Sequence, residues 1–475
     1  MAQLLLQGTN FVNFVGYNAW VGAEKQIAAV QVTEWDEPQA VIGSYLHQYA
    51  YPDYFAQHQA RDQRLPTINV HNTKDAARCL QLRGEYLYVA EGTGGMRVYD
   101  VASIANKGFS QKIVTAPFSP YGQDTHIAST NATCVALPTN QPINPLRNQG
   151  ELMRVTNQEQ PFHPIYHYAA VTDATEGLIL TDVDTLADRD PQNNFLSRAL
   201  TWNGDDSNRG ILNGARHILL GGHFAYISAD AGLVILDLDD PLQPKVASVV
   251  SLKGARAAAL QFRYLFALDD EGLTTIDVTD PYKARQVGVA RVPLADARRI
   301  YIARTYAYVA AGSEGLAIVD VERPEAPRLY MKFTADGKLN DARDVIVAST
   351  NASLFAYLAD GANGLKVLQL TSPDIQPKFY GFSPEPKPKL IAWRNTPSPA
   401  LALSKGLDRD RGVDETGGQI AVFGRIGSRP FTWDEMKRFY ERPDGSVWTV
   451  TDEARRDDFV PARSVAGGTT PAPTK

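Results

Sequence analysis

The sequence predicts an all-β fold, a β-propeller of four-stranded blades with long insertions between them. The first observation is a hairpin unit that recurs along the 475 residues: an alternating aromatic and apolar strand, a tight turn with Gly, and a second strand of Leu, Ile and Val. The second is its period, because the aromatic anchors Tyr226, Phe266, Tyr308 and Tyr357 follow one another at 40, 42 and 49 residues, which suits one blade per unit. The third is that no helical pattern of roughly 10–15 residues separates the strands, which excludes a doubly wound fold.

Eight stretches carry the unit, each with the same strand, turn and strand. Four are plain, two are looser and two are weak; they begin at His223, Tyr264, Tyr306 and Phe355, at Glu85 and Tyr166, and at Asn18 and Ala400. A Pro after the second strand removes a ladder donor and ends the pairing. The segment before a hairpin, such as residues 255–260, supplies the inner strand, and residues such as 246–252 supply an outer one. Eight units predict eight blades of four antiparallel strands, and seven blades are the alternative if the first and last units together make one.

Composition limits the class of partner. The chain is 44% hydrophobic, which is enough for a large core. Its formal net charge of −6 at pH 7 argues against nucleic acid or an anionic membrane as the main partner. No apolar run approaches the roughly 18 residues of a membrane-spanning helix, and the first ten residues lack a basic region. We therefore expect no transmembrane segment and no signal peptide in this chain.

The second strands of three units share a distinctive pattern, which reads GLVILDLDDP, GLTTIDVTDP and GLAIVDVERP. These strings resemble the LVIVD repeat, a bacterial propeller repeat, and the resemblance covers about residues 80–375. It implies a periplasmic or extracellular location, no defining enzymatic activity, and association with multihaem cytochromes. The chain itself has no CxxCH motif, so we expect no haem or other cofactor on it. Cys79 and Cys134 form one disulfide if the protein is exported, and two buried free thiols are the alternative.

Long insertions separate the earlier units. The anchors Tyr88 and Tyr168 are 80 residues apart, Tyr168 and Tyr226 are 58 apart, and residues 44–66 carry five aromatic side chains. Two interpretations stay open: the insertions pack against the propeller, or they form a surface that binds a partner.

The pattern changes after residue 430. Thr432 and Glu435 fit a capping box, and Met436, Phe439 and Tyr440 share one helical face. The predicted organisation is a propeller over residues 1–430, a short helix-and-hairpin appendage over 431–462, and a disordered tail over 463–475.

An Ala-Arg step recurs before the hairpins. Four of its arginines lie ten residues before their aromatic anchor, and the fifth is displaced by a four-residue insertion: Arg78, Arg216, Arg256, Arg298 and Arg343. Equivalent positions of a propeller form a ring, so five guanidiniums at the channel rim are candidates for binding an anion or an acidic partner loop. The competing account is structural, because buried charges are normally paired. Its acids are those of the second hairpin strands and those beside the steps: Asp100, Asp182, Asp237, Asp277 and Asp320, with Asp75, Asp296 and Asp341.

All eight histidines lie in the first half of the chain. Most lie in or beside insertions, and six are candidates for contact with the cofactor of a redox partner: His47, His58, His71, His126, His163 and His167. The alternative is that they are ordinary loop residues. A Pro between His163 and His167 removes the helical metal-binding geometry.

One acidic loop near the C-terminus is a candidate Ca²⁺ site. Its possible ligands are Asp408, Asp410, Asp414 and Glu415. The EF-hand spacing is absent and three basic residues interleave, so a solvated turn is the alternative.

The sequence contains no nucleophile elbow, Walker loop, HExxH motif or dinucleotide fingerprint, so it offers no catalytic residue. We expect a non-enzymatic propeller scaffold or protein-binding module, a subunit or domain of an exported redox or surface complex with a multihaem cytochrome. The alternative is a metal-dependent, lactonase-like hydrolase with its site in the central channel. That chemistry needs carboxylates, Asn or His where this repeat places Arg, which cannot ligate a cation.

Overall fold

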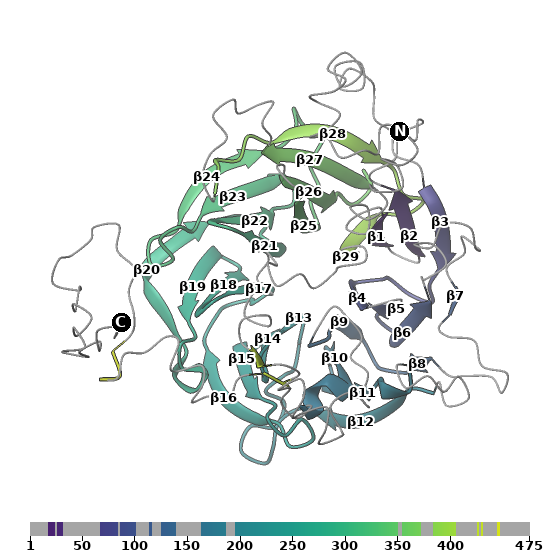
Figure 1. Ribbon diagram of the computed structural model, residues 1–475, viewed down its shortest axis with the longest axis vertical. Coiled ribbons are helices and arrows are strands. Elements are labelled where there is room, and N and C mark those ends of the chain that lie inside the picture. Colours follow the sequence, from purple (N-terminus) through teal and green to yellow (C-terminus); the bar gives the residue numbers. More distant parts are fainter. Residues whose placement is uncertain are drawn as a thin grey trace, which may run out of the picture. The chain divides into compact units, whose positions relative to one another are not determined.

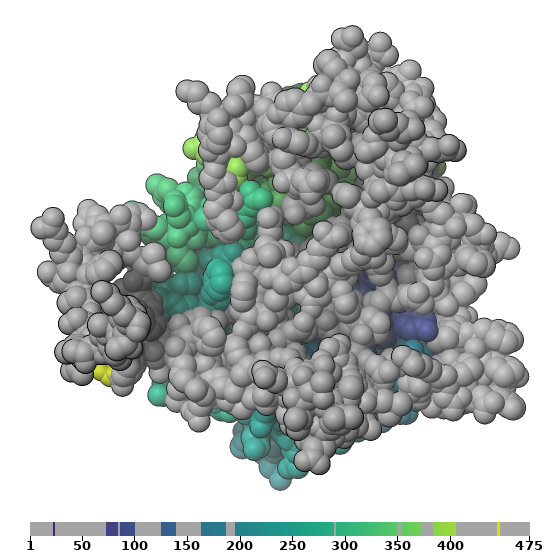
Figure 2. All heavy atoms as spheres, in the orientation of Figure 1, coloured from purple at the N-terminus to yellow at the C-terminus, as the bar shows by residue number. Residues whose placement is uncertain are grey.

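The structure of the protein is a computed structural model. It describes residues 18–23, 26–31, 67–83, 86–100, 114–115, 125–138, 163–186, 195–349, 354–371, 383–404, 425–426, 429–430 and 444–446. The residues whose side chains it describes are coloured in Figure 2. By compactness the chain divides into two units, Met1–Thr432 and Trp433–Lys475. In the second unit, residues 444–446 form a turn in which the Asp444 carboxylate accepts the Ser446 N–H at 2.8 Å. The rest of the predicted appendage and the predicted tail lie outside the described residues.

Antiparallel sheets form a ring in the first unit (Figure 1). Six sheets have four strands each, which run from the innermost strand outwards as follows: β29 (Ala400–Ser404), β1 (Asn18–Ala23), β2 (Gln26–Gln31) and β3 (Thr67–Asn72); β9 (Ala132–Ala136), β10 (Tyr168–Asp173), β11 (Gly177–Asp182) and β12 (Ser197–Trp202); β13 (His217–Gly221), β14 (Phe224–Ala229), β15 (Gly232–Asp237) and β16 (Lys245–Val250); β17 (Ala257–Gln261), β18 (Tyr264–Asp269), β19 (Gly272–Asp277) and β20 (Arg285–Pro293); β21 (Arg299–Ala303), β22 (Tyr306–Ala310), β23 (Leu316–Asp320) and β24 (Arg328–Phe333); and β25 (Asp344–Ser349), β26 (Leu354–Ala359), β27 (Leu365–Thr371) and β28 (Lys389–Arg394).

A further sheet has five strands: β4 (Cys79–Arg83), β5 (Tyr86–Ala90), β6 (Met96–Asp100), β7 (Val114–Thr115) and β8 (His126–Ile127). The remaining described elements are a short pair, β30 (Arg425–Ile426) with β31 (Arg429–Pro430), and three 3-10 turns, η3 (Pro164–His167), η4 (Asp184–Leu186) and η5 (Pro281–Lys283). The innermost strands touch in a closed cycle, in the order β4, β9, β13, β17, β21, β25, β29 and back to β4.

The predicted number of blades is wrong. The prediction was eight blades, or alternatively seven, of four strands each, whereas the described residues form six sheets of four antiparallel strands and one sheet of five. In the five-stranded sheet the outer strand is in two pieces that are separated in the chain between Thr115 and His126, so that β7 pairs with one end of β6 and β8 with the other. The unit that begins at Ala400 supplies β29, which pairs with β1 and so joins the two ends of the propeller in one sheet.

The hairpins follow the sequence pattern because their turns need glycine. In the turn between β18 and β19, Gly272 has φ +128°, and a Cβ there would lie 2.1 Å from the Val292 carbonyl oxygen of the outer strand. The pairing of each four-stranded sheet's third strand with its outer strand also shifts register once, as between Thr274 and Ile276. Such bulges increase the local twist, as a blade requires.

The core lies between neighbouring sheets. The predicted anchors Tyr226, Phe266 and Tyr308 are all buried. One cluster joins Phe266 of β18 to Val309 of β22, so the aromatic of one blade packs on the next. No described helix is long and apolar enough to cross a membrane.

A disulfide joins two sheets of the ring. Cys79 opens β4, Cys134 lies in β9, and their Cα atoms are 4.8 Å apart. Of the two alternatives for these cysteines, the bonded pair is the one in the structure. The bond ties together innermost strands that are adjacent in the ring.

Candidate functional site

Five arginines, which we call the arginine belt, occupy one equivalent position in five sheets, immediately before the innermost strand. The backbone N–H of each donates to a carbonyl near the end of the second strand: Arg78 to Ala90 at 2.9 Å, Arg216 to Ser228 at 2.8 Å, Arg256 to Leu268 at 2.9 Å, Arg298 to Ala310 at 2.9 Å and Arg343 to Ala359 at 2.7 Å. Because the same hydrogen bond fixes each residue, the belt lies at the end of the ring where the innermost strands begin.

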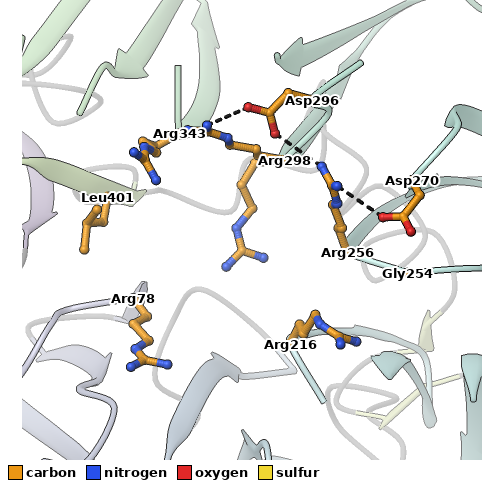
Figure 3. A pocket seen from close by; sticks show the side chains of 10 residues that line it. Arg78, Arg216, Gly254, Arg256, Asp270, Asp296, Arg298, Arg343 and Leu401 are labelled. Atoms are coloured by element: carbon orange, nitrogen blue, oxygen red, sulfur yellow. Dashed lines mark hydrogen bonds and ion pairs between the residues drawn. The ribbon is translucent and has the colours of Figure 1, made fainter. Parts of the chain in front are cut away.

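The belt lines a central cavity of about 680 Å³ (Figure 3). The structure thus brings all five predicted arginines together. It adds Arg299, Leu401, Asp270 and Asp296 to the lining. Sequence repetition did not single out Arg299, because the other sheets place unrelated residues at its position, such as Cys79, Ala257 and Asp344.

Ion pairs connect part of the belt across neighbouring sheets (Figure 3). The chain of contacts runs from Asp270 to Arg256 at 3.2 Å, Arg256 to Asp296 at 3.3 Å, Asp296 to Arg298 at 2.6 Å, Arg298 to Asp341 at 2.8 Å and Asp341 to Arg343 at 2.8 Å. The structural account of the belt is therefore correct for Asp296 and Asp341, which each bridge two arginines.

These contacts hold the bridging groups in their charged forms. Burial opposes the charge on Asp341, but hydrogen bonds from Arg343 and Arg298 outweigh it and lower the pKa of this carboxyl group. Burial likewise opposes the charge on Arg298, and hydrogen bonds to Asp296 and Asp341 raise its pKa overall. Groups of this kind hold a fixed charge at neutral pH and do not exchange protons there.

Each belt arginine has a carboxylate beside it, and each of these carboxylates lies against a glycine of the opposite segment. The carboxylate comes either from the segment before the arginine or from the turn after the second strand. The pairs of carboxylate and glycine are Asp75 with Gly92, Asp296 with Gly312, and Asp341 with Gly361 in the first arrangement, and Asp230 with Gly214 and Asp270 with Gly254 in the second. A Cβ on any of these glycines would lie within 2.6 Å of a carboxylate atom. Single-sequence reasoning missed these pairs, although Gly92 and Gly312 lie 14 residues after their arginines and Gly214 and Gly254 lie two residues before theirs.

The belt is less connected on its other side. Among the described residues Arg216 pairs only with Asp230, and the two side chains are exposed at 42% and 60%. The side chain of Arg78 makes no hydrogen bond or ion pair with any residue in the described ranges, and the nearby Asp75 carboxylate accepts the N–H and hydroxyl of Thr93. The two sheets without a belt arginine place Asn131 and Pro399 at its position.

The acids of the second hairpin strands do not pair with the belt, contrary to the structural account. They lie at the opposite end of the ring, where Asp237, Asp277 and Asp320 each accept a backbone N–H two residues further on, at 2.8, 2.9 and 3.0 Å. Asp182 does the same with Asp184. These carboxylates cap the turns after the third strands, because an Asx side chain bonds readily to the backbone two residues on. The side chain of Asp100 lies outside the described residues.

The structure does not bring the six candidate histidines to one site. His47 and His58 lie outside the described residues, and of His71 only the backbone is described, in β3. His126 contacts the Gly94 carbonyl at 2.6 Å in the five-stranded sheet. His163 precedes η3 and contacts Asp239 at 3.3 Å, and His167 is the last residue of η3 and contacts Asp184.

The candidate Ca²⁺ ligands Asp408, Asp410, Asp414 and Glu415 lie outside the described residues. Within the described ranges no three His, Cys, Asp or Glu side chains group so as to hold a metal ion.

Comparisons with known proteins concern the repeat and the fold. The LVIVD repeat model matches residues 76–110, 214–251 and 295–334, and each match includes a belt arginine. A search of curated proteins finds no match. Among solved structures the chain is similar to the β-propeller domain of Cps50 (Swd1) from Myceliophteria thermophila, with 11% identity, TM-score 0.42, and coverage of 70% of this chain and 90% of that chain. It is also similar to apo AztD from Citrobacter koseri, with 12% identity, TM-score 0.41 and coverage of 82% and 98%. A third similar structure is U3-55K, with 10% identity, TM-score 0.40 and coverage of 69% and 84%. The ring of sheets and the three repeat matches identify the chain as a β-propeller that carries LVIVD repeats.

Proposed function

We propose that this propeller is a non-enzymatic protein-binding module, a subunit or domain of an exported redox or surface complex whose partner is a multihaem cytochrome. The observation that carries the proposal is the set of ion pairs at the central cavity. There arginines and aspartates of neighbouring sheets hold one another in their charged forms. Such a surface recognises a charged partner, since fixed complementary charges give specificity and fast association.

The hydrolase alternative finds little support in the same cavity. A bound cation needs several carboxylate oxygens that are free to coordinate it. The two aspartates that line the cavity, Asp270 and Asp296, already pair with belt arginines, and six guanidiniums surround them. A cation at this place would face repulsion from those guanidiniums at close range.

The disulfide supports the proposed location. Bonds between cysteines persist in oxidising compartments and are rare in the cytosol of most cells. The Cys79–Cys134 bond is therefore what a periplasmic or extracellular protein would carry. The cytochrome partner rests on the resemblance to LVIVD-repeat proteins.

Affinity purification from the native cells tests the proposal. We expect the tagged protein to retain a stoichiometric partner through a mild wash, and the complex to show the absorbance of c-type haem, which this chain cannot attach by itself. Recovery of the propeller alone, from cells that express it at its natural level, contradicts the proposal. Recovery of a partner without haem keeps the binding module and removes the cytochrome.

A further inference from the structure

The ion-paired half of the belt, which is formed by Arg256, Arg298 and Arg343, repeats one pattern of contacts. Arg256 and Arg298 each contact the carboxylate of their own sheet and that of the next sheet around the ring. One carboxylate therefore bridges two arginines only when their sheets are neighbours. In this half, Arg256 and Arg298 therefore each lie between two carboxylates.

This pattern of contacts ends at Arg343, which makes no ion pair with a carboxylate of the next sheet among the described residues. Its ion-pair partner is Asp341 of its own sheet, and the next innermost strand is β29, which has Pro399 at the belt position. Beyond β29 comes Arg78, which has no ion-pair partner in the described residues, and beyond β9 comes Arg216, which has only the exposed Asp230. Figure 3 shows Arg343, Leu401 and Arg78 in succession along one side of the cavity, with Arg216 further round. We call Arg343, Arg78 and Arg216 the open arc.

The open arc has fewer carboxylates than the filled half: Arg343 pairs only with Asp341 and Arg216 only with Asp230 among the described residues, and Arg78 has no ion-pair partner there. A guanidinium presents planar pairs of N–H groups that match a carboxylate, as the filled half of the belt demonstrates with Asp296 and Asp341. The three arginines are separated from one another by β29 and by β9, so their sheets are not neighbours. In the filled half each bridging carboxylate joins arginines of neighbouring sheets, so we expect several carboxylates spaced along a peptide, and not one small anion, to reach all three.

We propose that the open arc binds an acidic segment of a protein partner, which inserts into the central cavity and places separate carboxylates on Arg343, Arg78 and Arg216. This site rests on the proposed function, because it takes the propeller to be a protein-binding module. The cavity of about 680 Å³ is open enough to admit such a segment, within the range of roughly 300–1,000 Å³ usual for ligand sites. The apolar side chain of Leu401 lies between Arg343 and Arg78 and would contact the aliphatic part of the segment.

Fluorescence anisotropy with labelled hexa-aspartate tests the site on the full chain. We expect saturable binding that weakens as salt is added, and no binding of labelled hexalysine. Arg78→Gln should weaken hexa-aspartate binding at least tenfold, because it removes a charge-assisted pair at the centre of the arc. Its melting temperature should not change, because Arg78 bonds to no described side chain. Arg78→Lys should bind at an intermediate level, since a lysine keeps the charge and loses the planar pair of donors.

The matched control is Arg328→Gln, which removes the same charge from an exposed position on β24, at the opposite end of the ring from the belt. We expect it to bind hexa-aspartate as the parent does. Equal binding by the parent, Arg78→Gln and Arg343→Gln would overturn the site, and so would a failure of hexa-aspartate to bind. Displacement of hexa-aspartate by pyrophosphate at concentrations where succinate has no effect would also overturn it, since the arc would then be a phosphate site.

Purification of the native complex separates this site from the proposed function. If the partner co-purifies with the parent and equally with the double variant Arg78→Gln, Arg343→Gln, the binding module stands and the open arc is not its site. If hexa-aspartate binds at the arc but no partner co-purifies with the parent, the site stands and the proposed function fails.

Discussion

At the residue scale, the carboxylate beside each belt arginine needs room that a glycine leaves. Gly312 has φ +51°, and a Cβ there would lie 2.1 Å from Asp296 Oδ2. Asp296 in turn contacts both Arg256 and Arg298. A methyl group at Gly312 would therefore disturb two ion pairs as well as strain the backbone.

This arrangement predicts the effect of Gly312→Ala. We expect the variant to lose about 2–4 kcal/mol of unfolding free energy, from the unfavourable φ and the displaced carboxylate together. The matched control is Gly337→Ala, where φ is +82° and no atom lies within 4 Å of the added Cβ, so that backbone strain alone costs about 1 kcal/mol. Chemical denaturation of both variants measures the two losses. Equal losses would contradict a role for the space beside Asp296.

A second residue-scale feature is the carboxyl group of Asp344, next to the belt. It accepts the backbone N–H of Leu403 at 2.8 Å and that of Val345 at 2.8 Å. Burial is the largest influence and raises the pKa of Asp344 from 3.8 to about 6, although nearby Arg299 acts in the opposite direction. The folded protein therefore holds this proton more tightly than the unfolded chain.

The sign of the pH dependence follows from linkage. Asp344 favours folding below about pH 4, and this contribution is lost as the pH rises through about 6. We expect the unfolding free energy of the parent relative to Asp344→Asn to fall by about 1–3 kcal/mol between pH 4 and pH 7. Denaturant titrations of both proteins across that range give the difference. Parallel curves for the two proteins would show that Asp344 does not titrate in this way.

At the element scale, hairpins and outer strands differ in how far the sequence predicts them. The two strands of a hairpin such as β18 and β19 are adjacent in the chain, and a short turn fixes their register, so the repeat pattern located seven hairpins correctly. Outer strands are partly exposed and follow loops of different length, as β16 does, and their alternation is weak. In the five-stranded sheet the outer strand is in two pieces, which no periodic pattern foretells.

The disulfide acts at this same scale, because it joins β4 to β9 across a sequence separation of 55 residues. We expect the double variant Cys79→Ser, Cys134→Ser to lose about 2–4 kcal/mol of unfolding free energy, chiefly because its unfolded chain is less constrained. Reductant should lower the stability of the parent by a similar amount and leave the double variant unchanged. Two reactive thiols per chain in the unfolded parent without reductant would contradict the bond.

At the scale of the whole molecule, the sequence predicted the closure of the ring only as an alternative, in which the first and last units together make one blade. The strand β29 pairs Ser404 with Trp20 of β1, and contacts that distant in the chain leave no local pattern. The belt was predictable from the sequence, because an arginine recurs at one position of five units and a ring brings equivalent positions close together. Its open arc was not, since it depends on which carboxylates the neighbouring sheets supply.

Closure through β29 predicts how truncation affects the fold. Besides its pairing with β1, this strand receives the Leu82 N–H of β4 on the Ser404 hydroxyl at 3.0 Å, and it donates the Leu403 N–H to Asp344 of β25. A chain of residues 1–399 loses all of these contacts and exposes the edge of β1, whereas a chain of residues 1–432 keeps them.

We expect residues 1–432 to unfold in one cooperative transition near the melting temperature of the full chain, and residues 1–399 to show no cooperative transition. Leu403→Pro in the full chain is the matched test of closure, because it disrupts the strand locally and keeps the chain length. It removes the N–H and the Leu side chain at a buried position and should cost about 3 kcal/mol or more. Calorimetry of the three proteins measures these outcomes. A cooperative transition for residues 1–399 at the temperature of the full chain would show that the other sheets hold the ring without β29.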